Sequence, residues 1–270
     1  MILSLIIGVA ALCWVAERYW PANDLPRVRA WHWRVAVVNL AQLGIVVLAG
    51  LTWDRWLAGA SLVKLDGRMG VLAQGLTAYL VSTFIYYWWH RFRHESRLLW
   101  NVFHQLHHSP QRIEVLTSFY KHPVEIAANS ILSAAIVYTL LGCSVQAGAV
   151  YTLLTALAEF FYHINLRTPQ WLGRLIQRPE SHRIHHQYRR HTQNFSDLPV
   201  FDMMFGTFAN AGEGKVRCGF DSWREDRFED MLVFKNINGK RADGRTPLHF
   251  LPSCIGCSKR WSCADLREEA

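Results

Sequence analysis

Eight histidines stand in three short groups whose spacing suits metal binding, and these are His90 and His94, then His104, His107 and His108, then His182, His185 and His186. A helix brings positions i, i+3 and i+4 to one face, so each group can offer two or three imidazoles from a single helix. Neutral imidazole binds iron, zinc, copper and nickel. Eight ligands exceed what one ion can use, and the pattern therefore predicts two metal ions.

Chance is the competing explanation for such groups. A lone histidine, such as His32 or His249, is more often a surface side chain than a ligand. One pair at i, i+4 could also arise on a basic helix. Three groups, two of them with the same H-x2-H-H spacing, are a much stronger signal in a chain with 13 histidines.

Long apolar segments separate and flank these groups. Residues 1–16, 35–53 and 69–89 carry no charge, and the last two are long enough to cross a bilayer as helices. Residues 126–158 are also uncharged but too long for one span, and Gly142 and Gly148 indicate a turn within them. We expect an all-α polytopic membrane protein with about three single spans, a helical hairpin and a cap of histidine-bearing helices.

The loop charges predict an orientation. Four arginines lie in the first connection, whereas the second holds only Arg55, Lys64 and Arg68. The positive-inside rule then places the first connection in the cytosol. Following the spans, both histidine-rich regions and the C-terminus are expected on the cytosolic side.

The charge distribution also bears on partners. The formal net charge is +8, with 29 Lys and Arg against 21 Asp and Glu, and the basic excess lies beside the apolar segments. Anionic lipid headgroups fit this placement. Nucleic acid fits poorly, because the arginines form no continuous stripe.

Three of the six cysteines, Cys254, Cys257 and Cys263, cluster near the C-terminus. With His249 they could form a zinc knuckle, but a tail of free thiols fits equally well. Cys13 and Cys143 lie in apolar runs and are expected to be packing residues.

The segments "HRFRH", "HQLHHSP", "FYHINLRTP" and "SHRIHHQ" resemble the histidine boxes of the fatty acid hydroxylase/sterol desaturase superfamily. The resemblance runs from about residue 86 to 207 and includes "KHPVE" and "NFSDLPVFDMMFGT". It implies an integral-membrane, non-haem di-iron enzyme that uses O2. It also implies that a ninth histidine, His163, joins the eight as a metal ligand, and that His122 and Asn194 support the ligands.

Some residues depart from the family pattern. Arg167 stands where some members have a further histidine, and Asn194-Phe195-Ser196 replaces the usual N-[YF]-G. These changes concern the surroundings of the boxes and leave the boxes intact. Glu159, four residues before His163, could orient that imidazole, although an interfacial ion pair is an equal possibility.

The resemblance and the residues together predict a three-part chain: membrane spans in 1–68, a catalytic domain in 69–210 and a cytosolic tail in 211–270. The expected function is hydroxylation or desaturation of a lipid C–H bond, with His107, His108, His185 and His186 as the catalytic histidines. Electrons are expected from a separate ferredoxin or cytochrome, because the chain shows no motif for a fused flavin or iron–sulfur module. The alternative is an inactive relative that binds metal or lipid. A transporter and an H-E-x-x-H zinc protease fit less well, since the boxes lie outside the apolar runs and Leu98 stands where the second protease histidine would be.

Overall fold

The protein is all-helical over the residues that the computed structural model describes, which are 2–57, 61–210, 212–213 and 215–237. Three of the described helical segments are long and apolar enough to cross a membrane, namely Ile2–Tyr19, Trp31–Leu57 and Pro123–Leu140. The chain is thus a polytopic membrane protein, as the sequence predicts. The cysteines at 254, 257 and 263, and His249, lie outside the described residues.

The first two apolar segments form α1 (Ile2–Tyr19) and α2 (Trp31–Leu51), followed by the short α3 (Trp53–Leu57). Most apolar side chains of α1 face outward, among them Leu3, Ile7 and Leu12. An exposed apolar surface of this kind on a long helix suits lipid contact.

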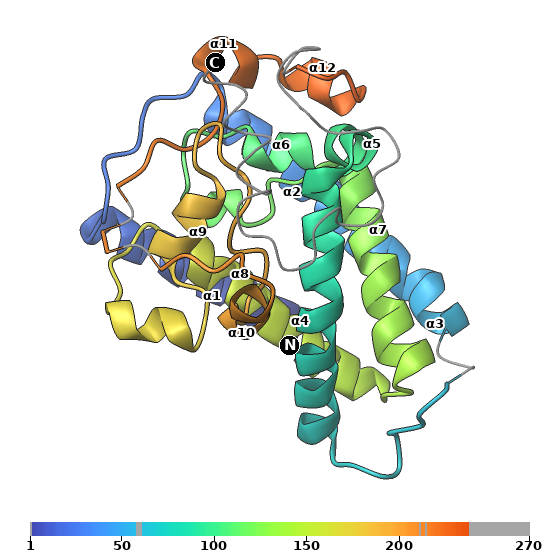
Figure 1. Ribbon diagram of the computed structural model, residues 1–270. Helices are drawn as coiled ribbons and strands as arrows, with labels where there is room; N and C mark the ends of the chain where they lie inside the picture. The colour runs from blue at the N-terminus through green and yellow to red at the C-terminus, as the bar shows by residue number, and fades with distance from the viewer. Residues whose placement is uncertain (1, 58–60, 211, 214, 238–270) are drawn as a thin grey trace.

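The third apolar segment forms the long helix α4 (Val71–Glu95). Although the sequence predicts a span here, α4 is not among the three helical segments apolar enough to qualify. Its polar residues explain the difference, since Gln74, Ser82 and Thr83 are buried against neighbouring elements. In Figure 1, α8 (Val145–His163) crosses behind α4, and these two helices share the most extensive contact in the described fold.

The predicted hairpin is present. Its first arm is α7 (Pro123–Ala134) continued by the π-helical turn η3 (Ala135–Leu140), and its second arm is α8. The turn lies at Gly142, whose φ of 63° favours glycine. Gly148 does not make the turn. It lies inside α8, where an added Cβ would come within 2.3 Å of the Tyr138 hydroxyl, so its role is close packing of the two arms.

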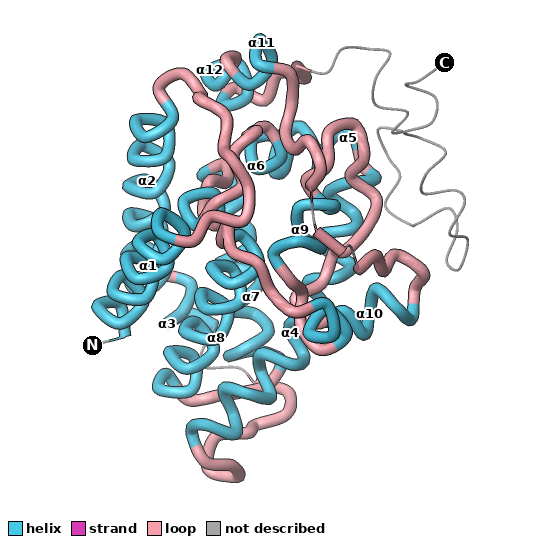
Figure 2. Tube along the Cα trace, turned by 90° about the vertical axis from the view of Figure 1, so that its left-hand side faces the viewer, coloured by secondary structure: helices cyan, strands magenta, loops and turns pink. Residues whose placement is uncertain are grey.

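Shorter helices form the part of the fold that carries the remaining boxes. They are α5 (Arg97–Leu99), η1 (Trp100–His104), α6 (Gln105–His108), η2 (Val115–Thr117), η4 (Gln170–Arg174), α9 (Pro179–His185), α10 (Pro199–Met204), α11 (Ser222–Glu225) and α12 (Phe228–Leu232). Helices α11 and α12 lie at the top in both overall views, near α6 (Figures 1 and 2). An aromatic and aliphatic cluster around Trp100, Leu106, Tyr120 and Met231 packs this region.

Candidate metal centre

The first histidine pair projects from the last turns of α4. His90 and His94 are one turn apart, so they share a face of the helix. The helix ends at Ser96, whose side chain accepts a hydrogen bond from the Leu99 N–H and begins the next helical turn. The pair is therefore held on a long, firmly packed helix.

The second box lies on a distorted helix. Residues Trp100–His104 form a π-helix, which passes into one α-helical turn at Gln105–His108. A π-helical turn changes the direction in which successive side chains point, and such turns are frequent at functional sites. Here it begins at Trp100 and ends at His104, the first histidine of the box.

The third box lies on α9, which begins with Pro179 at a position where a missing N–H costs nothing. Asn194 fixes the segment that follows. Its side chain donates to the carbonyls of Ser181 and Ala209 and accepts from the Ala209 N–H, each at 2.8 Å. Its φ of 58° is one that asparagine tolerates better than most residues.

All nine candidate ligands gather into two compact sets. The five-histidine set consists of His90, His94, His104, His108 and His185, and the four-histidine set consists of His107, His163, His182 and His186. Within each set, one ring nitrogen from every residue lies within 4.8 Å of the others. Eight of the nine are buried, and His90 is half-buried.

The second and third boxes contribute to the two sets reciprocally. The i, i+4 pair His104 and His108 belongs to the five-histidine set, while His107 between them joins the four-histidine set. In the third box the pair His182 and His186 belongs to the four-histidine set, and His185 crosses to the other. The sequence predicts two metals but not this exchange.

Outer hydrogen bonds fix the rings. The Nδ1–H of His90 donates to the Phe195 carbonyl at 2.8 Å and that of His185 to the Gln193 carbonyl at 2.7 Å. His107 and His163 likewise face the carbonyls of Tyr120 and Glu159 at 3.3 and 2.9 Å. A proton on Nδ1 leaves Nε2 as a bare lone pair, which is the form that coordinates metal.

Two carboxylates stand behind the sets, one for each. Glu125 Oε1 accepts from His104 Nδ1 at 2.9 Å, and the same oxygen pairs with the buried Arg93 guanidinium. Glu159 lies behind the other set, with Oε2 3.5 Å from His163 Nδ1 and Oε1 2.5 Å from Lys121 Nζ. Carboxylates in this position orient a ligand imidazole and raise its basicity.

Burial favours the uncharged form of the ligand histidines. Burial lowers the pKa of His163 to about 4 and that of His185 to about 3. Burial, followed by the neighbouring rings, also holds the pKa of His108, His182 and His186 well below its usual range. Neutral rings are available to a cation.

The arrangement of Nε2 atoms fits a metal ion in each set. His182 Nε2 lies 3.0 Å from His163 Nε2 and 3.1 Å from His186 Nε2, and His104 and His108 approach to 3.2 Å in the same way. Nitrogens bound tetrahedrally at 2.0–2.1 Å would stand about 3.3 Å apart. The buried Nε2 atoms of His90 and His185 have no hydrogen-bond partner among the described residues. Facing lone pairs repel one another, and a shared cation would relieve that repulsion.

The three residues expected to support the ligands differ in position. Glu159 lies beside His163, and it also makes the ion pair that was the competing expectation, with Lys121 rather than an arginine. Asn194 acts on the backbone next to the third box, as described above. His122 engages its two ring nitrogens outside both sets: Nδ1 accepts from the Val124 N–H, which caps α7, and Nε2 faces the Leu232 carbonyl.

Sequence reasoning missed Glu125 and Gln177 as site residues. The Gln177 amide lies 2.5 Å from His182 Nδ1. A signal for Glu125 did exist, because it closes the "KHPVE" element and is the acid in the first turn of α7. His191, for which no role was predicted, is buried and packs its ring 4.7 Å from that of His108.

Comparison with known proteins agrees with this geometry. Residues 75–207 match the family model "Fatty acid hydroxylase", and the match contains all nine histidines. Over these residues, about half of its length, the chain is similar to the fatty acid hydroxylase family. The resemblance noted in the sequence is thereby confirmed.

Several curated relatives of this superfamily are similar to the chain. Alkylglycerol monooxygenase of Homo sapiens is 30% identical over 52% of this chain and 32% of its own length. Sphingolipid C4-hydroxylase sur2 of Schizosaccharomyces pombe is 27% identical over 45% of this chain and 43% of its own. Ornithine lipid hydroxylase OlsE of Rhizobium tropici is 30% identical over 54% and 48%.

The chain spans between about a third and a half of the length of these three relatives. No solved structure matches it. The similarity to the hydroxylases therefore concerns the histidine-bearing residues 75–207, and it does not by itself give the activity of the whole protein.

Proposed function

We propose that this protein is a membrane di-iron oxygenase that hydroxylates, or desaturates, a C–H bond of a lipid with O2 and external electrons. The observation that carries the proposal is the pair of buried histidine sets, one with five rings and one with four. The lipid hydroxylases and monooxygenases among the relatives support the reaction class.

Each set would hold one metal ion. Both sets contain only imidazole among the described residues, and imidazole suits iron and zinc alike. Iron is the proposed working metal, because zinc has no redox chemistry to offer an oxygenase. Bound iron would supply the reduction of O2 and the oxidation of the C–H bond.

The protein's own side chains orient and shield this centre. Backbone carbonyls hold His90, His163 and His185 through Nδ1, and the Glu125 carboxylate holds His104 in the same way. The Nε2 atoms of these rings therefore stay aimed inward without reorganisation. Burial of the sets limits the access of water, which would otherwise compete for the ligands and quench reactive species.

The four histidines proposed as catalytic lie where the two sets meet. His108 of the five-histidine set stacks on His186 of the four-histidine set with ring centroids 4.2 Å apart. The neighbours His107 and His108, and His185 and His186, also belong to different sets, with centroids 5.4 and 5.3 Å apart. This position supports the proposal that His107, His108, His185 and His186 surround the place where O2 and the C–H bond react.

The remaining proposals concern the setting of the reaction. The substrate is a lipid that reaches the centre from the membrane, and a separate ferredoxin or cytochrome supplies the electrons. The active site and the C-terminus face the cytosol. The chain divides into membrane spans in 1–68, the catalytic domain in 69–210 and a tail in 211–270.

A lipid comparison tests the activity. Cells that express the wild-type chain should contain oxidised lipids that are absent from cells expressing His107→Ala at equal protein level. Substrate-dependent O2 consumption by purified membranes should follow the same difference. Identical lipid profiles and no O2 consumption would instead favour an inactive, metal- or lipid-binding relative.

A further inference from the structure

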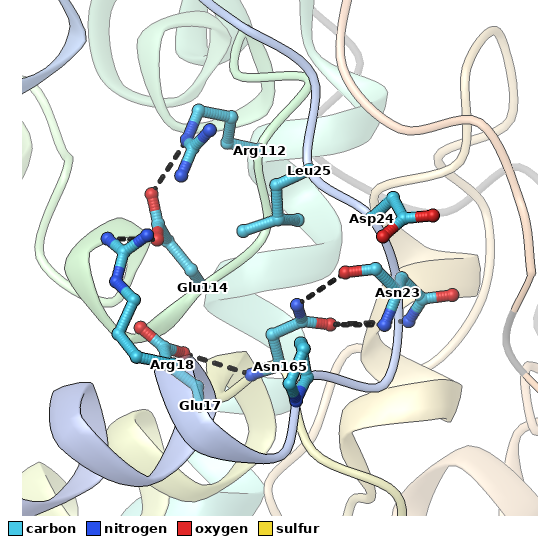
Figure 3. A pocket seen from close by; sticks show the side chains of 9 residues that line it. Glu17, Arg18, Asn23, Asp24, Leu25, Arg112, Glu114 and Asn165 are labelled. Carbon is cyan, nitrogen blue, oxygen red and sulfur yellow. Dashed lines mark hydrogen bonds and ion pairs between the residues drawn. The ribbon is translucent and has the colours of Figure 1, made fainter.

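A cavity of about 220 Å³ lies at the C-terminal end of α1, and none of the nine histidines lines it. Figure 3 shows its charged and polar lining, which comes from α1, the connection that follows it, the segment after the second box and the loop after His163. The charged residues that line it are Glu17, Arg18, Asp24, Arg112 and Glu114.

The two guanidiniums already have a partner. Glu114 is fully buried and accepts from Arg112 Nε at 2.8 Å, from Arg18 at 3.3 Å and from the Trp31 indole at 2.6 Å. Arg112 also donates to the Pro26 carbonyl at 2.8 Å. Arg112 thus donates to the protein, and the partly exposed Arg18 pairs with the same carboxylate, which weakens the cavity as an anion site.

Glu17, unlike Glu114, forms no ion pair with the arginines of this lining in the described contacts. Its side chain is only 3% exposed, and Oε2 accepts from the N–H groups of Val115 and Asn165 at 2.9 and 3.1 Å. No donor among the described residues reaches the buried Oε1. A buried carboxylate without a counter-charge is costly, and a cationic donor in the adjacent cavity would offset that cost. Asp24, exposed at the same cavity, forms no ion pair within the described part of the chain.

The cavity lies at the level of lipid headgroups. It adjoins the end of an apolar membrane-spanning helix, where Tyr19 and Trp20 are 74% and 72% exposed. Exposed aromatic residues at the end of a span mark the membrane–water interface. The commonest cationic donor at that depth is the amine of a lipid headgroup.

We propose that this cavity binds the protonated primary amine of a membrane lipid, with Glu17 as its acceptor and Asp24 as a further negative charge at the same cavity. The lining contains three carboxyl groups and two guanidiniums, so acceptors outnumber cationic groups, which suits an ammonium group. Figure 3 shows Glu17 and Asp24 on opposite sides of the lining, so the ammonium would donate to Glu17 while Asp24 acts through its charge.

One segment of the chain contributes to both the cavity and the metal centre. Asn165, whose N–H binds Glu17, stands two residues after the candidate ligand His163. A lipid anchored here by its amine would lie beside the four-histidine set. That the bound lipid is also the substrate rests on the proposed function, whereas amine binding itself does not.

Native mass spectrometry of the full-length, metal-loaded protein in detergent tests amine binding. The probes are phosphatidylethanolamine, phosphatidylcholine and phosphatidylglycerol with identical acyl chains. Only the first carries N–H donors on a positively charged amine, so it should be retained roughly 10-fold better than the other two. Equal retention of all three, or strongest retention of phosphatidylglycerol, would overturn the proposal.

Matched variants locate the binding. Glu17→Gln keeps an oxygen for the N–H groups of Val115 and Asn165 but turns a donor toward the amine, so retention of phosphatidylethanolamine should fall to that of phosphatidylcholine. Asp24→Asn, at an exposed position, should lower it in the same direction if Glu17→Gln does not fold. Glu213→Gln, also exposed, is the control and should change nothing. If the Glu17 and Asp24 variants keep the wild-type preference for phosphatidylethanolamine, the lipid binds outside this cavity and the proposal is wrong.

Cells expressing Glu17→Gln separate a substrate from a structural lipid. Loss of oxidised lipid with metal content intact would support the substrate extension, and unchanged oxidised lipid would overturn that extension alone. If the proposed oxygenase function is wrong, the wild-type chain forms no oxidised lipid, while its retention of phosphatidylethanolamine is unaffected.

Discussion

His108 and His186 stack face to face, with ring centroids 4.2 Å apart and planes 19° from parallel, although they belong to different histidine sets. Each is the last histidine of an H-x2-H-H box. Their contact joins the two sets into one centre. His107 and His185, which belong to the opposite set from the last histidine of their own box, lie beside this contact. A substitution in either box should therefore change metal binding in both sets.

The unequal size of the sets predicts unequal tolerance to histidine loss. His163→Ala leaves three rings in the four-histidine set, whereas His90→Ala leaves four rings in the other. We expect His163→Ala to lose close to one metal per chain and His90→Ala to retain more, as metal analysis of purified protein can show. His32→Ala, at an exposed position outside the sets, is the control. Equal losses in the two ligand variants would contradict the assignment of the sets.

Glu125 should matter through His104. Glu125→Ala removes the acceptor of His104 Nδ1–H and leaves the buried Arg93 without its counter-charge. Metal affinity should fall by roughly 10- to 100-fold, as for other groups that orient a ligand. Glu125→Gln keeps an acceptor oxygen, so its loss should be smaller. Metal titration of the two variants measures the difference, and indistinguishable affinities would count against a role in orienting His104.

His122 should act on stability rather than on the metal. Its imidazole caps α7 and touches neither set in the hydrogen bonds described. His122→Ala should cost about 1 kcal/mol, the usual effect of losing a helix cap, with metal content unchanged. His122→Asn should recover much of the loss, because asparagine is a good cap. Thermal unfolding together with metal analysis provides the check, and a fall in bound metal at unchanged stability would contradict it.

The topology proposal predicts the side on which each end of the chain lies. A reporter inserted near Gln111 and another fused after Ala270 should both read as cytosolic, since both histidine-rich regions must face one compartment. Labelling of intact cells at single introduced cysteines would give the same answer independently. An extracytoplasmic signal at either position would contradict the orientation that the loop arginines predict.

Much of this organisation could be predicted from the sequence. Uncharged stretches predicted the membrane helices, and Gly142, one of two glycines expected at the hairpin turn, lies there. The spacing of eight histidines predicted two metals, and the family resemblance added the ninth histidine, His163. Local patterns of this kind suffice because helices are set by neighbouring residues. The span expected in 69–89 was not found among the three candidate spans, because the buried polar residues of α4 make this helix less apolar than those three segments.

The division of the histidines could not be predicted. It depends on how the rings of the second and third boxes meet, and on the π-helical turn Trp100–His104, which no local sequence pattern predicts. Glu125 was missed for a similar reason, since the ring it orients lies 21 residues earlier in the chain. His122, which the resemblance implied would support the ligands, instead accepts from the Val124 N–H and faces the Leu232 carbonyl.

The most direct test of the central claim is the metal content of gently purified protein, measured by elemental analysis with iron supplied during expression. Two buried sets predict close to two metal ions per chain, with iron as the ion that supports O2-dependent turnover. Zinc can fill the same imidazole sets during overexpression, but such protein should be inactive. One metal ion per chain, or full activity after the loss of both His107 and His185, would contradict the di-iron account.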